Sequence, residues 1–351
     1  TTYTASQGLM LMIPPMFRIA GEFLPGVFHV SARTVAQNMW SIFGDQSDVM
    51  TCRSTGFAML ASACPQEAMD LGAVAHLAAI KARHPFMHFF DGFRTSHELQ
   101  KIDALDYEDL RPLVDMDQLN AFRKHSLNPE HPHVRGTTAS SETFFQGREA
   151  GNGHYDAIPD IVQHYMDEIN KLTGRNYKLF DYYGAPDAEE VVVVMGSGAE
   201  TARETVDYLM SQGRKVGMIS VHLFRPFSAK HFLTVLPETV RKVAVLDRTK
   251  ESGSVGEPLY LDVKAVLTGR SFDAIVGGRF GLAAKDTTPS QIIAVYDNLE
   301  QAEPKNGFTI GIVDDVTFTS LPCKDIILPK EGEISCKLWG TGGDGTVGAN
   351  K

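Results

Sequence analysis

Arg33 stands where an arginine can bind a carboxylate. It follows residues 26–31, a continuous apolar run with β-branched residues that predicts a short buried strand. Ligands of open α/β sheets gather outside the carboxyl ends of the strands. An arginine there can hold a carboxylate through two parallel, charge-assisted hydrogen bonds. The alternative is a surface arginine paired with a nearby Asp or Glu, and the spacing alone leaves both interpretations open.

A second candidate site is the turn Gly196-Ser197-Gly198, which follows the apolar run 191–195. A glycine pair after a strand is typical of a dinucleotide-binding turn. Here Thr201 replaces the third glycine, and the next strand runs into His222 rather than into an acid that could hold a ribose. A structural turn is therefore favoured over a nucleotide site.

Other residues invite a metal or anion interpretation. His131 and His133 lie among prolines with no third ligand nearby, which favours a loop over a metal site. The sequence has 4 cysteines and no C-x-x-C pair, so we expect no iron–sulfur cluster and no structural zinc in this segment. Five glycines within residues 340–348 could let the backbone approach an anion, or could form a linker.

Alternating strand and helix patterns predict an α/β fold with a parallel sheet. Around Arg33 we expect Thr34 to cap a helix over 35–42 and a strand to follow at 49–52. The further expected strands are 85–90, 191–195, 215–221, 240–246 and 309–313, and the further expected helices are 66–82, 155–172, 200–210 and 229–236, with the alternation continued by 259–267, 272–277 and 288–298.

Composition limits the class of protein. The 351 residues suggest two or three domains, and 43% hydrophobic with 22% charged residues is typical of a globular protein. A formal charge of −10 argues against nucleic acid or an anionic membrane as partner, and no apolar run is long enough to span a bilayer. Because the sequence begins at Thr1 without a methionine and stops in a glycine-rich turn, we expect an internal piece of a longer polypeptide.

Several motifs along the whole sequence resemble those of the pyruvate:ferredoxin (flavodoxin) oxidoreductase family. They are TASQG (4–8), LPGVFHVSAR (24–33), SIFGD (41–45), HFFDGFRTSHE (88–98), RPF (225–227), DRTKE (247–251), GEPLY (256–260) and GTVGANK (345–351). The resemblance implies three units. Residues 1–177 would be a pyrimidine-binding-type domain lacking its N-terminal part, residues 178–335 a transketolase C-terminal-like α/β domain, and residues 336–351 the start of a gamma-type domain.

The resemblance also implies the chemistry. Family members use thiamine diphosphate, Mg²⁺ and [4Fe–4S] clusters to convert pyruvate and coenzyme A to acetyl-CoA and CO₂, with electrons passed to ferredoxin or flavodoxin. A homodimer in the cytoplasm, or in a hydrogenosome, is expected. The Mg²⁺ ligands, the cluster cysteines and the glutamate that acts on the aminopyrimidine would lie outside these residues, so the segment alone should be inactive.

Four site residues follow from the same resemblance. Arg33 matches the family arginine that pairs with the pyruvate carboxylate. Ile42 is a candidate for the aliphatic wall that holds the cofactor in its bent form, and Gly348 and Asn350 are candidates for coenzyme A contacts. Three alternatives stay open: a pyruvate:NADP⁺ oxidoreductase core, an oxidoreductase for a bulkier 2-oxoacid, and a non-catalytic scaffold.

Overall fold

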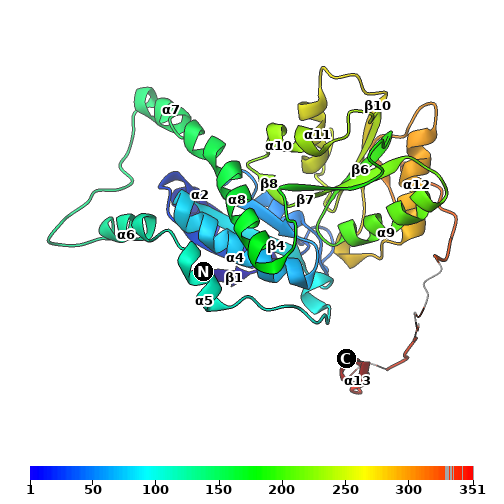
Figure 1. Cartoon of the computed structure of the whole chain (residues 1–351), viewed down its shortest axis with the longest axis horizontal. Coiled ribbons are helices and arrows are strands. Elements are labelled where there is room, and N and C mark those ends of the chain that lie inside the picture. The colour runs from blue at the N-terminus through cyan, green and yellow to red at the C-terminus, as the bar shows by residue number, and fades with distance from the viewer. Residues whose placement is uncertain (329–331, 333, 335, 342, 351) are drawn as a thin grey trace.

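The computed structural model describes residues 1–328, 332, 334, 336–341 and 343–350. Two α/β halves lie side by side (Figure 1). The first half contains β1 (Thr2–Thr4), α1 (Ser6–Met10), α2 (Ile13–Gly21), β2 (Gly26–Ala32), α3 (Ser47–Thr51), β3 (Ala58–Ser62), α4 (Pro65–Ala82), β4 (Pro85–Asp91), η1 (Thr95–His97), α5 (Tyr107–Leu110), η2 (Arg111–Leu113), α6 (Met116–Lys124), α7 (Ser141–Glu149) and α8 (Asn152–Thr173).

The second half follows without a long connection. It contains β5 (Phe180–Gly184), β6 (Glu190–Met195), α9 (Gly198–Ser211), β7 (Val216–Val221), β8 (Leu223–Arg225), α10 (Ala229–Val235), β9 (Lys242–Asp247), α11 (Pro258–Leu267), β10 (Ala274–Arg279), η3 (Leu282–Ala284), α12 (Pro289–Glu300), β11 (Phe308–Thr309) and α13 (Thr346–Asn350).

Each half is built on a mainly parallel sheet. In the described part of the chain the strand orders are β1-β2-β4-β3-β8 and β11-β10-β9-β6-β7-β5. Two strands run antiparallel to their neighbours: β8 pairs with β3, and β5 pairs with β7. The predicted α/β fold is thus confirmed. The first sheet also takes its last strand from the second half of the sequence, so the two halves share a sheet edge.

Burial on both faces explains the apolar strands. Along β6, Val191 and Val193 join the core cluster that also contains residues of the first half, of α10 and of α11. Val192 and Val194 join the opposite cluster, with residues of α9 and α12. Because successive side chains of a strand point to opposite faces, a strand covered by helices on both sides has a continuous apolar sequence.

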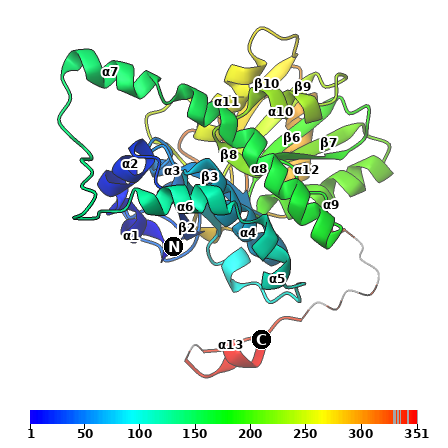
Figure 2. The ribbon, with the colours of Figure 1, turned by 60° about the vertical axis from the view of Figure 1, so that its left-hand side comes forward.

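In the first half, α4 packs on β2, β3 and β4 and lies beside α8. Helix α7 projects away from the sheets (Figure 2).

Two expectations near Arg33 were wrong. Residues 35–46 are not helical, and where a strand was expected at 49–52, residues 49–51 belong to helix α3 and Cys52 is its C-cap. The next strand is β3, which the sequence patterns did not predict. A run of four residues, three of them apolar, is too short to separate strand from helix. Asp48 in the first turn of α3 was the sequence signal for a helix.

Candidate functional site at the carboxyl end of β2

Arg33 lies directly beyond the carboxyl end of β2, where the sequence places it. The last residue of β2, Ala32, is paired with Asp91, the last residue of β4. The turn after β4 then crosses close to Arg33, with the Gly92 N–H donating to the Ala32 carbonyl at 2.9 Å. A Cβ on Gly92 would lie 2.5 Å from that carbonyl oxygen and 3.1 Å from Cγ of Arg33. Glycine at position 92 therefore leaves room for the arginine side chain.

The guanidinium of Arg33 stacks on an aromatic ring. Its Cζ lies 4.7 Å from the centroid of the Phe93 ring. Phe93 has a φ of 58°, a left-handed backbone that is unusual for a bulky residue. Its ring is held by His97, stacked at 4.5 Å, and by Phe43, edge-on at 5.2 Å. The Phe93 ring covers one face of the guanidinium. The N–H groups at the edge of the guanidinium are then the part that can bind a ligand.

The Nε of Arg33 is buried and has no hydrogen-bond partner. Among the residues that the structure describes, Arg33 takes part in no ion pair, whereas its neighbour Arg94 pairs with Asp286. The surface ion pair considered as an alternative is therefore not what the structure contains. A buried N–H without an acceptor is costly, and a carboxylate at this position would satisfy it.

Thr34 closes a loop instead of capping a helix. Its hydroxyl donates to the Ser41 carbonyl at 2.6 Å, and its N–H donates to the Phe43 carbonyl at 3.3 Å. A hydroxyl that bonds a distant carbonyl competes with the helix that the sequence predicts over 35–42. Ile42 lies between the two acceptor residues and is 44% exposed. The loop thus holds the residues on both sides of Ile42 to Thr34, the residue after Arg33, although the expected element was wrong.

The glycine turn after β6 is filled from within the molecule. The N–H and hydroxyl of Ser197 donate to Oδ2 of Asp91 at 2.8 and 2.7 Å, and Arg248 Nη1 lies 2.5 Å from the same oxygen. Gln46 Nε2 donates to Oδ1 at 3.0 Å. Burial favours the neutral carboxyl, but Arg248 and these donors hold the pKa of Asp91 below its ordinary value. A carboxylate therefore occupies the anion position at Gly196–Gly198, which favours the structural turn.

The other predicted positions are not brought to Arg33. Gly348 and Asn350 belong to α13, a five-residue helix, and the side chain of Asn350 lies outside the described residues. Their role in coenzyme A binding stays a prediction.

Within the described residues, no group of three or more His, Cys, Asp or Glu side chains could hold a metal ion. No helix in this part of the chain is long and apolar enough to cross a membrane.

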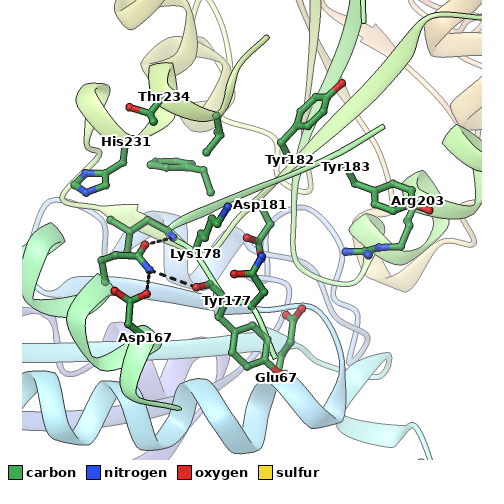
Figure 3. Close-up of a pocket in the computed structure, with 15 residues that line it drawn as sticks. Glu67, Asp167, Tyr177, Lys178, Asp181, Tyr182, Tyr183, Arg203, His231 and Thr234 are labelled. Carbon is green, nitrogen blue, oxygen red and sulfur yellow. Dashed lines mark hydrogen bonds between the residues drawn. The ribbon is translucent and has the colours of Figure 1, made fainter. Parts of the chain in front are cut away.

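A separate cavity of about 810 Å³ lies between α8, β5 and α10 (Figure 3). Polar groups in its wall bind one another: Gln163 donates to Asp167 and accepts from the Leu179 N–H, at 2.9 and 3.1 Å. Arg203 stacks on Tyr183 at 4.6 Å. Arg33 does not line this cavity. The bond between Gln163 and Leu179 joins α8 to the start of the second half of the chain.

Two residues of the site were missed by the sequence patterns. Phe93 follows the Asp91-Gly92 pair, a turn signal at the end of a strand, but nothing in the spacing shows that its ring reaches Arg33. Asp48 lies in the first turn of α3 and binds the backbone of Arg33, with its Oδ2 accepting from the Arg33 N–H at 3.0 Å. Both contacts depend on how loops fold over the strand ends.

Comparison with known proteins places this site in a family. Residues 1–167 match the family "pyruvate flavodoxin/ferredoxin oxidoreductase, thiamine diP-bdg", and residues 188–292 match "pyruvate:ferredoxin oxidoreductase core domain II". The whole chain is 60% identical to pyruvate:ferredoxin oxidoreductase of Moorella thermoacetica and 58% identical to pyruvate-flavodoxin oxidoreductase of Enterobacter agglomerans. It spans about 30% of the length of each of these curated relatives.

A solved structure has a similar fold. It is a 2-oxoglutarate:ferredoxin oxidoreductase from Magnetococcus marinus, with a TM-score of 0.55 and 16% identity over 85% of this chain and 53% of that one. At this identity the likeness concerns the fold alone. The two family matches and the identity along the full chain decide the classification. The chain therefore belongs to the pyruvate:ferredoxin/flavodoxin oxidoreductase family and carries its thiamine-diphosphate-binding domain together with its core domain II.

Proposed function

We propose that these residues form part of an enzyme that oxidises pyruvate with coenzyme A. The products are acetyl-CoA and CO₂, and two electrons pass through [4Fe–4S] clusters to ferredoxin or flavodoxin. Relatives named for this activity are 58–60% identical to the chain over its whole length. Because the chain spans about 30% of those relatives, we assign the Mg²⁺ ligands, the cluster ligands and the electron acceptor's docking site to polypeptide outside these residues.

Arg33 is the proposed binding residue for the pyruvate carboxylate. The observation that carries this assignment is its buried Nε without a partner, in a guanidinium whose Cζ lies 4.7 Å from the centroid of the Phe93 ring. A carboxylate can accept two parallel hydrogen bonds from such a guanidinium. Arg33 would hold the carboxylate in a fixed orientation, from which CO₂ can depart, and positioning of this kind lowers the entropic part of the barrier.

Ile42 is the proposed cofactor contact. Its exposed aliphatic side chain, on the loop that Thr34 closes, fits an apolar ring rather than a charged group. Bound thiamine diphosphate supplies the carbon nucleophile and the electron sink that decarboxylation requires. The part of this chain is to hold the substrate's carboxylate at Arg33 and to present an apolar wall beside it. Gly348 and Asn350 are proposed to contact coenzyme A.

A second candidate differs in the electron acceptor. Pyruvate dehydrogenase [NADP(+)] of Cryptosporidium parvum is 51% identical along this whole chain and is matched over 18% of its length. The residues described here belong to a core that both kinds of enzyme share, so the acceptor depends on sequence elsewhere. A bulkier 2-oxoacid would also present a carboxylate to Arg33.

The experiment is an assay of the complete native enzyme with pyruvate and coenzyme A. Reduction of ferredoxin or flavodoxin, with release of one CO₂ for each acetyl-CoA, is the expected result. Reduction of NADP⁺ instead would support the second candidate. Faster turnover of a larger 2-oxoacid would change the substrate. Absence of activity with every 2-oxoacid, in a preparation that retains its cofactor and clusters, would contradict the proposal and favour a scaffold.

A further inference from the structure

The backbone of Arg33 lies outside the sheet and needs another support. Ala32 is the last residue of β2 that pairs with β4. Beyond it, both polar backbone groups of Arg33 bond to one residue, Asp48. The Arg33 N–H donates to Oδ2 of Asp48 at 3.0 Å, and the Asp48 N–H donates to the Arg33 carbonyl at 3.4 Å. Asp48 therefore holds the main chain of Arg33 on both sides of its Cα, the atom that carries the proposed substrate-binding side chain.

The same carboxylate oxygen holds a second loop. Oδ2 of Asp48 accepts the N–H of Ser6 at 2.7 Å, and the Ser6 hydroxyl donates to the carbonyl of Thr34 at 2.6 Å. Ser6 has a φ of 50°, a left-handed backbone that must be held by its surroundings. Asp48 thus joins the starts of α3 and α1 to the end of β2 at one point.

The carboxylate of Asp48 is buried without a cation. Its side chain is 0% exposed, and among the described residues it forms no ion pair; its other oxygen accepts the N–H of Val49 at 2.7 Å. Burial raises the pKa of Asp48 to about 7, against the effect of its backbone donors, and the nearby Asp45 raises it further. Cys52 is a further titratable group beside it: burial raises the pKa of the Cys52 thiol, and Asp48 raises it further.

We propose that Asp48 is a positioning residue for substrate binding, which fixes the direction of the Arg33 side chain over Phe93 by holding the main chain of Arg33 and Ser6. The inference rests on the proposed function of Arg33. The proposal follows from the contacts of one buried atom: Oδ2 of Asp48 accepts from the backbone N–H groups of both Ser6 and Arg33 and so positions two segments beside the proposed substrate site. A misplacement of about 1 Å at such a point can cost on the order of 100-fold in rate.

The test compares two variants in the complete enzyme. Asp48→Ala removes the acceptor for both N–H groups, so we expect the pyruvate KM to rise by about 10- to 100-fold with a smaller change in kcat. Asp48→Asn keeps an amide oxygen for the same N–H groups and should restore most of the pyruvate affinity. The ionised carboxylate is the stronger acceptor, so wild-type kcat/KM for pyruvate should rise as the pH passes through about 7. This step should be absent in Asp48→Asn.

Asp45→Ala is the matched control. Asp45 is also a buried carboxylate, 3% exposed, but it accepts from Ser47 and Ala283 and does not touch Arg33. We expect it to lower the melting temperature and to leave the pyruvate KM unchanged. If Asp48→Ala lowers stability in the same way without raising KM, Asp48 is only structural and the proposal is overturned. If Asp48→Ala does not fold, an unaltered pH profile in Asp48→Asn overturns it.

A parallel Arg33→Ala variant separates this inference from the proposed function. An unchanged pyruvate KM in Arg33→Ala would overturn the role of Arg33 and with it the role of Asp48. A raised KM in Arg33→Ala, together with an unchanged KM in Asp48→Ala, would overturn the role of Asp48 alone.

Discussion

At the scale of single residues, Phe93 links an unusual backbone to a proposed binding role. A left-handed phenylalanine costs about 1–3 kcal/mol and persists only where the surrounding structure enforces it. Here the Phe93 N–H donates to the Ser96 hydroxyl at 2.9 Å, and the ring stacks on His97 at 4.5 Å. The result is an aromatic face that lies under the Arg33 guanidinium. We interpret the strained turn as the element that aims this face.

Replacing Phe93 by leucine tests this interpretation. Phe93→Leu keeps an apolar side chain but removes the cation–π contact, which is worth about 0.5–2 kcal/mol. The pyruvate KM should rise by roughly 2- to 30-fold in steady-state assays of the complete enzyme. Phe43→Leu is the control, because Phe43 packs edge-on against Phe93 and forms no cation–π contact with Arg33. Equal effects of the two changes would show that general packing, not the stack on Arg33, is responsible.

At the scale of elements, long periodic patterns were predicted well and loops were not. The sequence patterns placed β2, β4, α4, α8, β6, β7, β9, β10 and α9 to α12 close to their observed bounds, missed β5 and β8, and placed the two-residue β11 at 309–313. Each element that was placed well has an apolar stripe or run long enough to identify its period. The segment 35–46 lacks one, and the hydroxyl of Thr34 decides its path by bonding to Ser41. Ile42 was therefore predicted at the site, but within a helix that does not exist.

Contacts between distant loops explain the rest of what was missed. Arg33 could be predicted because a residue just past a strand end has a known place in an α/β sheet. Asp48 and Phe93 reach Arg33 only after two loops have folded over that edge. Similarly, the turn at Gly196–Gly198 resembles an anion site in sequence, and only the structure shows that Asp91 occupies it.

The connection between β7 and β8 carries a buried, charged histidine. His222 Nε2 donates to Oδ2 of Asp181 at 3.0 Å, its Nδ1 donates to the Ala61 carbonyl at 3.1 Å, and Oε2 of Glu67 lies 3.8 Å from Nδ1. Burial would lower the pKa of His222, but Glu67 and Asp181 outweigh it and raise the pKa to about 9. His222 is thus a cation that links the two halves of the chain.

This cation makes stability depend on pH. Because the folded pKa lies above the unfolded value of about 6.5, the stabilisation is complete below pH 6.5 and is lost as the pH rises through about 9. His222→Gln should therefore be less stable than the wild type at pH 6, by on the order of 3 kcal/mol, with a difference that shrinks toward pH 9.5. Thermal unfolding over a pH series measures it. His164→Gln, at an exposed histidine of α8, should show no such trend, and a constant difference for His222→Gln would contradict the assignment.

At the scale of the whole molecule, a buried ion pair joins the carboxyl ends of strands from the two sheets. Asp91 ends β4 of the first sheet, and Arg248 directly follows β9 of the second. Their side chains are 0% and 3% exposed, and Ser197 and Gln46 bind the same carboxylate. The strand ends of both sheets therefore meet at one network, close to the turn that supports Arg33.

Asp91→Asn should destabilise the protein at neutral pH. The change leaves Arg248 buried without its counter-charge, and breaking a buried pair in this way costs about 3–5 kcal/mol. The pKa of Asp91 is lowered in the folded state, so its contribution is present above the unfolded value of about 3.9 and is lost as the pH falls below it. Denaturant unfolding at pH 7 and at lower pH measures both effects. Asp286→Asn, at the exposed partner of Arg94, should change stability by less than about 1 kcal/mol, and a similar small change for Asp91→Asn would refute the role of the network.

The pyruvate KM of Arg33→Ala in the complete enzyme tests most directly whether Arg33 binds the substrate. Loss of a buried, charge-assisted pair costs roughly 2–5 kcal/mol, so the KM should rise at least about 30-fold. Arg94→Ala is the matched control, since Arg94 lies three residues after β4 but is bound to Asp286 and to the Ala284 carbonyl. We expect a large rise in KM for Arg33→Ala and little change for Arg94→Ala. Unchanged pyruvate kinetics in Arg33→Ala would show that Arg33 does not bind the carboxylate.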